Sequence, residues 1–125
     1  LLFAARGIGR HDSEGRTRSA LANFRFFEAP HVAFIFMPDW GGVREAVDCG
    51  IYAQTLMLAL TAAGLASCAQ GALGNYPEIV RSELGIAEDQ RLLFGIAFGR
   101  EDVAHATRPV RPPRGPLGST TVFHS

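Results

Sequence analysis

The sequence feature that most restricts the fold is residues 49–77, which contain no charged side chain. Apolar residues recur at helical spacing from Val43 to about Ala66, and the predicted helix is apolar on nearly every side. Such a helix must be covered all round, so it has to lie inside a protein, in a subunit interface or in a membrane.

Two observations weigh against the membrane alternative. Polar residues and four glycines interrupt the charge-free stretch, and no aromatic belt or basic cluster flanks it. We therefore expect a helix that is buried within a soluble protein or between subunits, with no membrane contact.

Charge and composition exclude several function classes. Lys+Arg and Asp+Glu balance at 12 each, so no basic field is available to bind nucleic acid. The four histidines show no metal-ligand spacing, and no metal site is expected. Two cysteines form neither a disulfide framework nor a zinc pattern, which favours a cytoplasmic location.

Two short apolar runs are typical of buried strands. His31–Met37 is bounded by prolines, and Gln90–Gly99 is the second run, with a strand-like segment, residues 119–124, at the end of the chain. Between the two runs a short helix is predicted from Pro77, ending before Gly85. Strands separated by helices predict an α/β or α+β domain, and the surplus apolar surface of the long helix favours a dimer.

The stretch after the long helix, "ASCAQGAL" (residues 66–73), is almost free of large side chains. One interpretation is a cofactor platform, because a planar ring can lie flat on a peptide only where side chains do not hold it away. The other is a close turn between two helices. The residues alone leave both open.

Other candidate residues carry similar pairs of interpretations. Arg108, Arg111 and Arg114 lie in a proline-stiffened segment, where they can fork onto a phosphate or form a solvated tail. Cys68 has no His or Asp at a suggestive spacing and is predicted to be a small buried thiol. The three phenylalanines of "ANFRFFEAP" (residues 22–30) can line an apolar channel or fill a core corner.

Taken together, the chain resembles the C-terminal portion of the FMN-dependent nitroreductase family. The resemblance runs from about Leu21 to His124 and rests on blocks in one order. They are "NFRFFEAPHVAFIFM", "REAVDCGIYAQTLMLALTAAGLASCAQGAL", "YPEIVRSELGI", "RLLFGIAFGRED" and "RGPL". The second block is the most specific of the five.

The resemblance implies an α+β fold with a mixed sheet flanked by helices, in an intertwined homodimer with two FMN sites at the subunit interface. It also implies a ping-pong reaction, in which NAD(P)H reduces the flavin at N5 and a nitroaromatic, quinone or similar acceptor is then reduced. The chemistry belongs to the cofactor, so no side chain is assigned as catalytic.

Carried onto this sequence, the flavin-facing loop of the family falls on Ala69, Gln70, Gly71 and Ala72. The N–H of Gly71 is expected to point at the flavin N5, and the amide of Gln70 to supply a donor and an acceptor. The phosphate-binding arginine falls on Arg114, with Arg111 as a helper. For Asp48 and Gln54 the resemblance implies only a structural or interface role.

The chain also departs from the family pattern. The N-terminal Arg/Ser phosphate clamp is expected before Leu1, and a proline and an aromatic residue are common where Ala69 and Arg100 stand. We therefore expect a single partial nitroreductase-like domain over residues 1–125, with residues 100–125 as an extended C-terminal arm. Two alternatives remain: a dimerisation or binding module that has lost flavin, and a flavoenzyme for dehalogenation or enone reduction.

Overall fold

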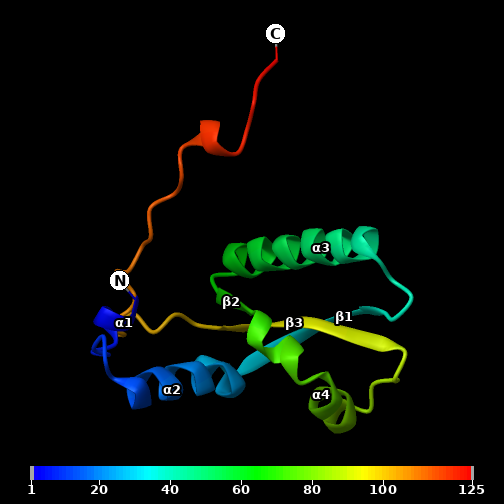
Figure 1. Cartoon of the computed structure of the whole chain (residues 1–125), viewed down its shortest axis with the longest axis horizontal. Coiled ribbons are helices and arrows are strands. Elements are labelled where there is room, and N and C mark those ends of the chain that lie inside the picture. Colours follow the sequence, from blue (N-terminus) through cyan, green and yellow to red (C-terminus); the bar gives the residue numbers. More distant parts are fainter. Residues whose placement is uncertain (1, 125) are drawn as a thin grey trace. The chain divides into compact units, whose positions relative to one another are not determined.

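The computed structural model describes residues 2–124 and divides into two compact units (Figure 1). One unit is Thr17–Glu101, and the other comprises the described residues before Thr17 and after Glu101. The helices and strands are α1 (Leu2–Ala5), α2 (Ser13–Leu21), β1 (His31–Pro38), α3 (Val43–Ala62), β2 (Ala66–Gln70), α4 (Pro77–Leu84) and β3 (Gln90–Gly99), with 3-10 helices η1 (Ala22–Glu28), η2 (Gly71–Asn75) and η3 (Leu117–Ser119).

The larger unit is built on a three-stranded antiparallel sheet with the order β1-β3-β2. Helix α3 lies along one side of the sheet, and α4 and the short helix before it lie on the other side (Figure 1). The α+β class is therefore confirmed. All strand pairs among residues 2–124 are antiparallel, so the mixed character implied by the resemblance is not seen in this part of the chain.

The core lies between the sheet and α3. Ile96 of β3 is completely buried and packs with Ile35 of β1 and Ala53 of α3. Burying one aliphatic side chain of this size stabilises the fold by roughly 1.5–3 kcal/mol. The strands predicted from the two apolar runs are thus confirmed, with β1 one residue longer than expected.

Glycines flank helix α3 on both sides, with Gly42 before its first residue and Gly64 shortly after its last. The Glu45 carboxylate accepts a hydrogen bond from the N–H of Gly42 at 2.8 Å and caps the first turn. Hydrogen bonds from the backbone N–H groups of Glu45 and Gly42 lower the pKa of that carboxyl group. At the other end Gly64 adopts a φ of +75°, which favours glycine, and the helix ends at Ala62, earlier than the predicted Ala66.

Two further expectations are wrong. The small-residue stretch after the long helix was expected to be a close turn or a flavin-facing loop, but Ala66–Gln70 form strand β2, because they pair with the free edge of β3 from Ala66 opposite Gly99 to Gln70 opposite Gly95. The segment 119–124 was expected to be strand-like, yet η3 ends at Ser119 and residues 120–124 form no strand. Across residues 2–124, no helix combines the length and the apolar character that crossing a bilayer requires.

Candidate functional site

The small-residue stretch leaves an exposed strip of backbone where β2 passes into η2. Ala69 and Gly71 are exposed, and Ala72 is half-buried. A Cβ added at Gly71 would have no heavy atom within 4 Å, so the space in front of this residue is open. The first N–H groups of a 3-10 helix have no partner within the helix, and here they belong to Gly71 and Ala72. The strip can therefore receive a flat molecule and donate hydrogen bonds to it.

The turn that carries this strip is fixed by close packing on β3. Leu73 is buried, and a Cβ added at Gly95 would clash with its side chain. Gly74 lies so close to the carbonyl oxygen of Leu93 that a Cβ there would clash with the main chain. The main chain therefore leaves no room for a side chain at Gly74, whereas a Cβ at Gly95 would require the Leu73 side chain to move.

Gln70 occupies the last position of β2 and differs from its neighbours. Its side chain is 2 % exposed, and its Nε2 donates a hydrogen bond to the main-chain oxygen of Asn23 at 3.0 Å. Its Oε1 is buried and accepts no hydrogen bond within the part of the chain that the structure describes. The structure thus brings residues 69–72 together in one turn, with the Gln70 amide directed inward.

The arginine candidates belong to the other compact unit, which includes the described residues after Glu101. Arg111 donates from Nη1 to the main-chain oxygens of Arg108 and Val110, the latter at 3.1 Å, so part of its guanidinium group is used within its own segment. Arg114 is exposed. Between residues 102 and 124 this segment contains turns around residues 103–109 and the short helix η3, and no strand.

An apolar cavity that sequence reasoning did not locate lies beside the 3-10 helices, on the side of the sheet opposite α3. Its volume is about 690 Å³. The ring of Phe24 packs edge-to-face on Tyr76 with centroids 5.3 Å apart, and that of Phe26 packs similarly on Phe34 at 6.1 Å. These four rings line the cavity, and Glu83 is its one acidic lining residue. The three phenylalanines of residues 22–30 were the available signal for it.

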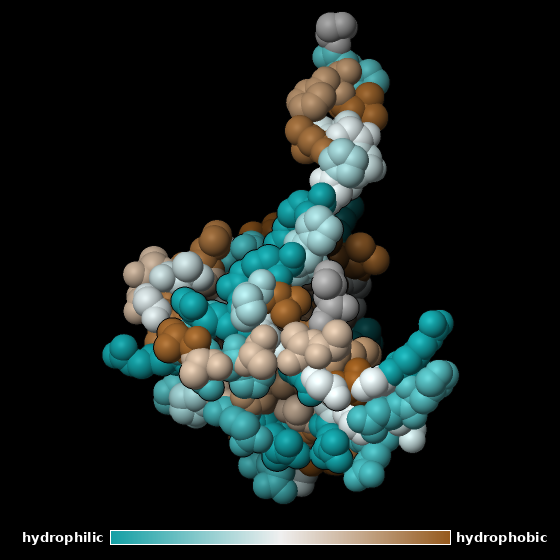
Figure 2. All heavy atoms as spheres, turned by 90° about the vertical axis from the view of Figure 1, so that its left-hand side faces the viewer, coloured by the Kyte–Doolittle hydropathy of each residue, from teal (hydrophilic) through white to brown (hydrophobic). Residues whose placement is uncertain are grey.

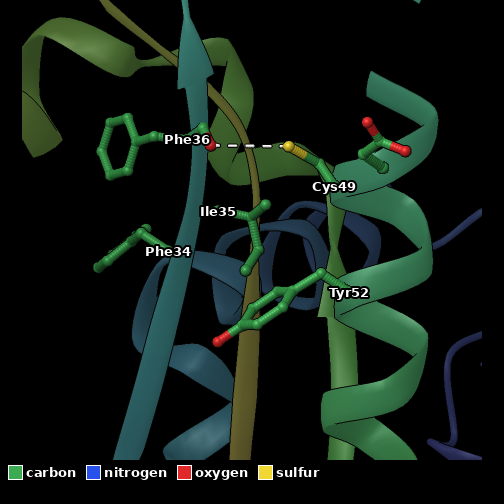
Figure 3. A pocket seen from close by; sticks show the side chains of 6 residues that line it. Phe34, Ile35, Phe36, Cys49 and Tyr52 are labelled. Atoms are coloured by element: carbon green, nitrogen blue, oxygen red, sulfur yellow. Dashed lines mark hydrogen bonds between the residues drawn. The ribbon is translucent and has the colours of Figure 1, made fainter. Parts of the chain in front are cut away.

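A smaller cavity of about 390 Å³ lies between β1 and α3 and includes Asp48 among its lining residues. Figure 3 shows Ile35 pointing from β1 toward α3, whereas Phe34 and Phe36 point away from that helix. The Cys49 thiol lies 3.7 Å from the main-chain oxygen of Phe36. Neither of these two cavities is lined by residues 69–72.

The two cysteines differ in environment. Cys49 is half-buried, whereas Cys68 is exposed, so the prediction of a small buried thiol at Cys68 is wrong. It fails because residues 66–70 form a strand at the edge of the sheet. Among residues 2–124 no three His, Cys, Asp or Glu side chains are grouped as metal ligands.

Large apolar side chains also remain at the surface, where Figure 2 shows hydrophobic residues among hydrophilic ones. On α3 they recur along the side that faces away from the sheet and are more than half exposed: Val43, Val47, Ile51 and Leu58. Gln54 lies exposed among them. This face is the apolar surplus expected from the sequence.

Comparison with known proteins gives consistent relatives. The model of the nitroreductase family matches residues 4–100. Nitroreductase NfnB of Mycolicibacterium smegmatis is 48% identical over 122 residues, which cover 98% of this chain and 52% of that protein. A chloronitrobenzene nitroreductase of Comamonas testosteroni is 34% identical and is also covered to 52%. The chain therefore spans about half the length of these curated relatives.

Solved structures agree closely in fold. The FMN-dependent nitroreductase NfnB from Mycobacterium smegmatis, solved in complex with NADPH, superposes with a TM-score of 0.94 over 99% of this chain and 55% of that one, at 48% identity. The FMN and NADPH-dependent nitroreductase NfnB from sphigopyxis sp. strain HMH gives a TM-score of 0.95 at 35% identity, with 56% of its chain covered. The resemblance stated from the sequence is thereby confirmed.

Proposed function

Because the chain belongs to the nitroreductase family, we propose that its protein is an FMN-dependent NAD(P)H oxidoreductase that reduces nitroaromatic compounds. The observation that carries the proposal is the open backbone at Gly71, next to exposed Ala69, at the end of a short edge strand. A ring system can lie against this peptide without meeting a side chain.

The residues present fit FMN in two respects. Gly71 and Ala72 would donate N–H groups to acceptor atoms at the edge of the ring, since both stand at the start of η2. Arg114 would bind the phosphate through its guanidinium fork, with Arg111 as a helper. When bound, FMN supplies the hydride-transfer chemistry, and the protein contributes position and hydrogen bonds.

The exposed apolar face of α3 supports a homodimer. Val47, Ile51 and Leu58 lie on this face and would be covered by a second copy, which would also bring further walls to the open strip. Replacing Leu58 with Asp should then shift the protein from dimer to monomer in analytical ultracentrifugation. A cytoplasmic location is part of this proposal, because the two cysteines of the sequence do not form a disulfide framework.

The names of the relatives favour one acceptor class and one donor. Two of them are called chloronitrobenzene nitroreductase and 4-nitrobenzoate reductase, which supports a nitroaromatic acceptor over a quinone. Two solved relatives are named with NADPH, which supports NADPH as the donor. A screen of nitroaromatics, quinones, halogenated aromatics and enones with both nicotinamides would rank these choices by kcat/KM.

The direct test is flavin uptake by the complete gene product that contains this chain. We expect the purified protein to be yellow and to release FMN on denaturation. A colourless dimer that takes up no added FMN would contradict the proposal and would identify the protein as a dimerisation module without flavin.

Arg114→Ala tests the phosphate assignment separately. A charge-assisted hydrogen bond contributes about 1.5–3 kcal/mol, so the Kd for FMN should rise roughly 10- to 150-fold. Riboflavin, which lacks the phosphate, should bind the variant and the unchanged protein equally, as measured by quenching of flavin fluorescence. Unchanged FMN affinity would remove Arg114 from the site.

A further inference from the structure

The side chain of Gln70 points away from the surface that its neighbours expose. Ala69 and Gly71 are exposed, whereas Gln70 is 2 % exposed. Successive strand residues face opposite sides of a sheet, so the Gln70 side chain points to the side opposite that of Ala69. A ring lying against Ala69 and Gly71 would therefore meet the peptide and would not meet the Gln70 amide.

The inward amide joins two segments that are far apart in the sequence. Gln70 Nε2 donates to the main-chain oxygen of Asn23 at 3.0 Å, and Asn23 belongs to η1. Later in the same segment Phe26, Phe27 and Glu28 have φ values of 54°, 53° and 62°. Left-handed conformations of residues other than glycine cost of order 1–3 kcal/mol each and persist only where surrounding contacts hold them. The Gln70 hydrogen bond anchors the start of η1 at Asn23, three residues before this left-handed run.

If packing were the only role of Gln70, a glutamine at this position would cost free energy that an apolar side chain would not. Its Oε1 is buried and receives no hydrogen bond from a donor in the described residues, and a buried unsatisfied polar group costs about 1–3 kcal/mol. An apolar side chain of the same length would fill the space without that cost. What Gln70 adds is a directional bond to the main chain of η1.

We propose that Gln70 is a positioning residue, whose amide holds the end of β2 against η1 and thereby sets the direction of the Gly71 and Ala72 N–H groups. The effect on flavin rests on the proposed function, because those two N–H groups are the ones assigned to the ring edge. The amide acts through the backbone and does not touch the ring.

Hydrogen exchange without flavin tests the clamp in the complete gene product. Gln70→Met keeps the length of the side chain and removes both polar atoms. Exchange should accelerate several-fold, up to about tenfold, in residues 71–75 and 22–28, as expected for the loss of one net hydrogen bond. Gln90→Met is the matched control, because Gln90 Nε2 bonds only the adjacent Asp89, at 3.4 Å; it should leave both segments unchanged.

The flavin gives a readout that loss of stability would not move. In Gln70→Met the midpoint potential of bound FMN should shift, because the N–H groups at the ring edge are redirected. In Gln70→Glu the clamp should return as the pH is lowered, because a protonated carboxyl group can donate to Asn23 oxygen whereas a carboxylate cannot. This nearly isosteric variant also supplies the measurement if Gln70→Met fails to fold.

The outcomes separate the two proposals. Unchanged exchange in residues 71–75 and 22–28, or faster exchange spread evenly over the whole sheet, would overturn the positioning role. A shifted potential together with local exchange supports it. Absence of flavin uptake by the unchanged protein would overturn the proposed function instead, while the exchange measurement would still decide whether the clamp exists.

Discussion

The two strands that flank β3 differ in amino-acid composition and in burial. β1 has eight residues, most of them large and apolar, and it buries Ile35 and Met37. β2 has five residues, nearly all small, and of these only Gln70 is buried. Both pair with the same central strand. From this difference we infer a division of roles between the two edges. The β1 edge contributes most to the stability of the fold, and the β2 edge provides a surface that is open to a ligand.

The largest test of this division is Ile35→Ala on the β1 side. Ile35 is 7 % exposed and packs with Ile96 and Ala53, so its truncation should lower the free energy of unfolding by about 2–5 kcal/mol. The FMN affinity of the protein that stays folded should not change. Both are measured at one protein concentration, by urea unfolding and flavin titration.

The matched change on the β2 side is Cys68→Ala, which removes an exposed thiol. Surface substitutions of this kind stay within about 0.5 kcal/mol. A cost comparable to that of Ile35→Ala would show that β2 contributes as much stability as β1, and the comparison would fail.

The next effect concerns ligand binding and is expected from Gly71→Val. A Cβ at Gly71 meets no heavy atom within 4 Å and the backbone φ is not left-handed, so the fold should tolerate the change. The new side chain would stand where the flavin ring is proposed to lie. FMN should bind at least about tenfold more weakly, or ~1.4 kcal/mol, with unfolding unchanged.

Gly118→Val is the control, because Gly118 also lies in open space, in the other unit. It should leave FMN binding unaltered. If Gly71→Val bound FMN as tightly as the unchanged protein, the strip would not be the flavin platform, although the chain would remain a member of its family.

The same contrast explains what sequence could predict. β1 and β3 are short apolar runs, which are typical of buried strands. Helix α4 is bounded by Pro77 and by Gly85, whose φ is +64°. These signals are local, so they were read correctly. β2 has no β-branched or aromatic residue, and it is a strand only because the edge of β3 needs a partner.

The sequence could indicate which residues form the candidate site, but it could not indicate where their side chains point. The small residues of positions 69–72 left a flat platform and a close turn open as alternatives, and the family resemblance favoured the platform. Cys68 and Gln70 are two residues apart in β2 and so face the same side of the sheet, yet only Gln70 is buried, because its side chain reaches the main-chain oxygen of Asn23, 47 residues earlier in the chain. The aromatic cavity requires η1, β1 and α4 to meet, and no local pattern encodes that meeting.

The smallest effect is a difference in thiol reactivity, which reports the two edges in the native protein without a destabilising change. Cys49 is half-buried beside β1, with its sulfur 3.7 Å from Phe36 oxygen, whereas Cys68 on β2 is exposed. Since alkylation follows access to the thiol, Cys68 should react with iodoacetamide roughly tenfold faster, as measured by peptide mass spectrometry over time. In denaturant the two rates should converge, which controls for intrinsic reactivity. If Cys49 reacted first under native conditions, the β2 edge would be covered in the protein, and a surface open to a flavin could not be located there.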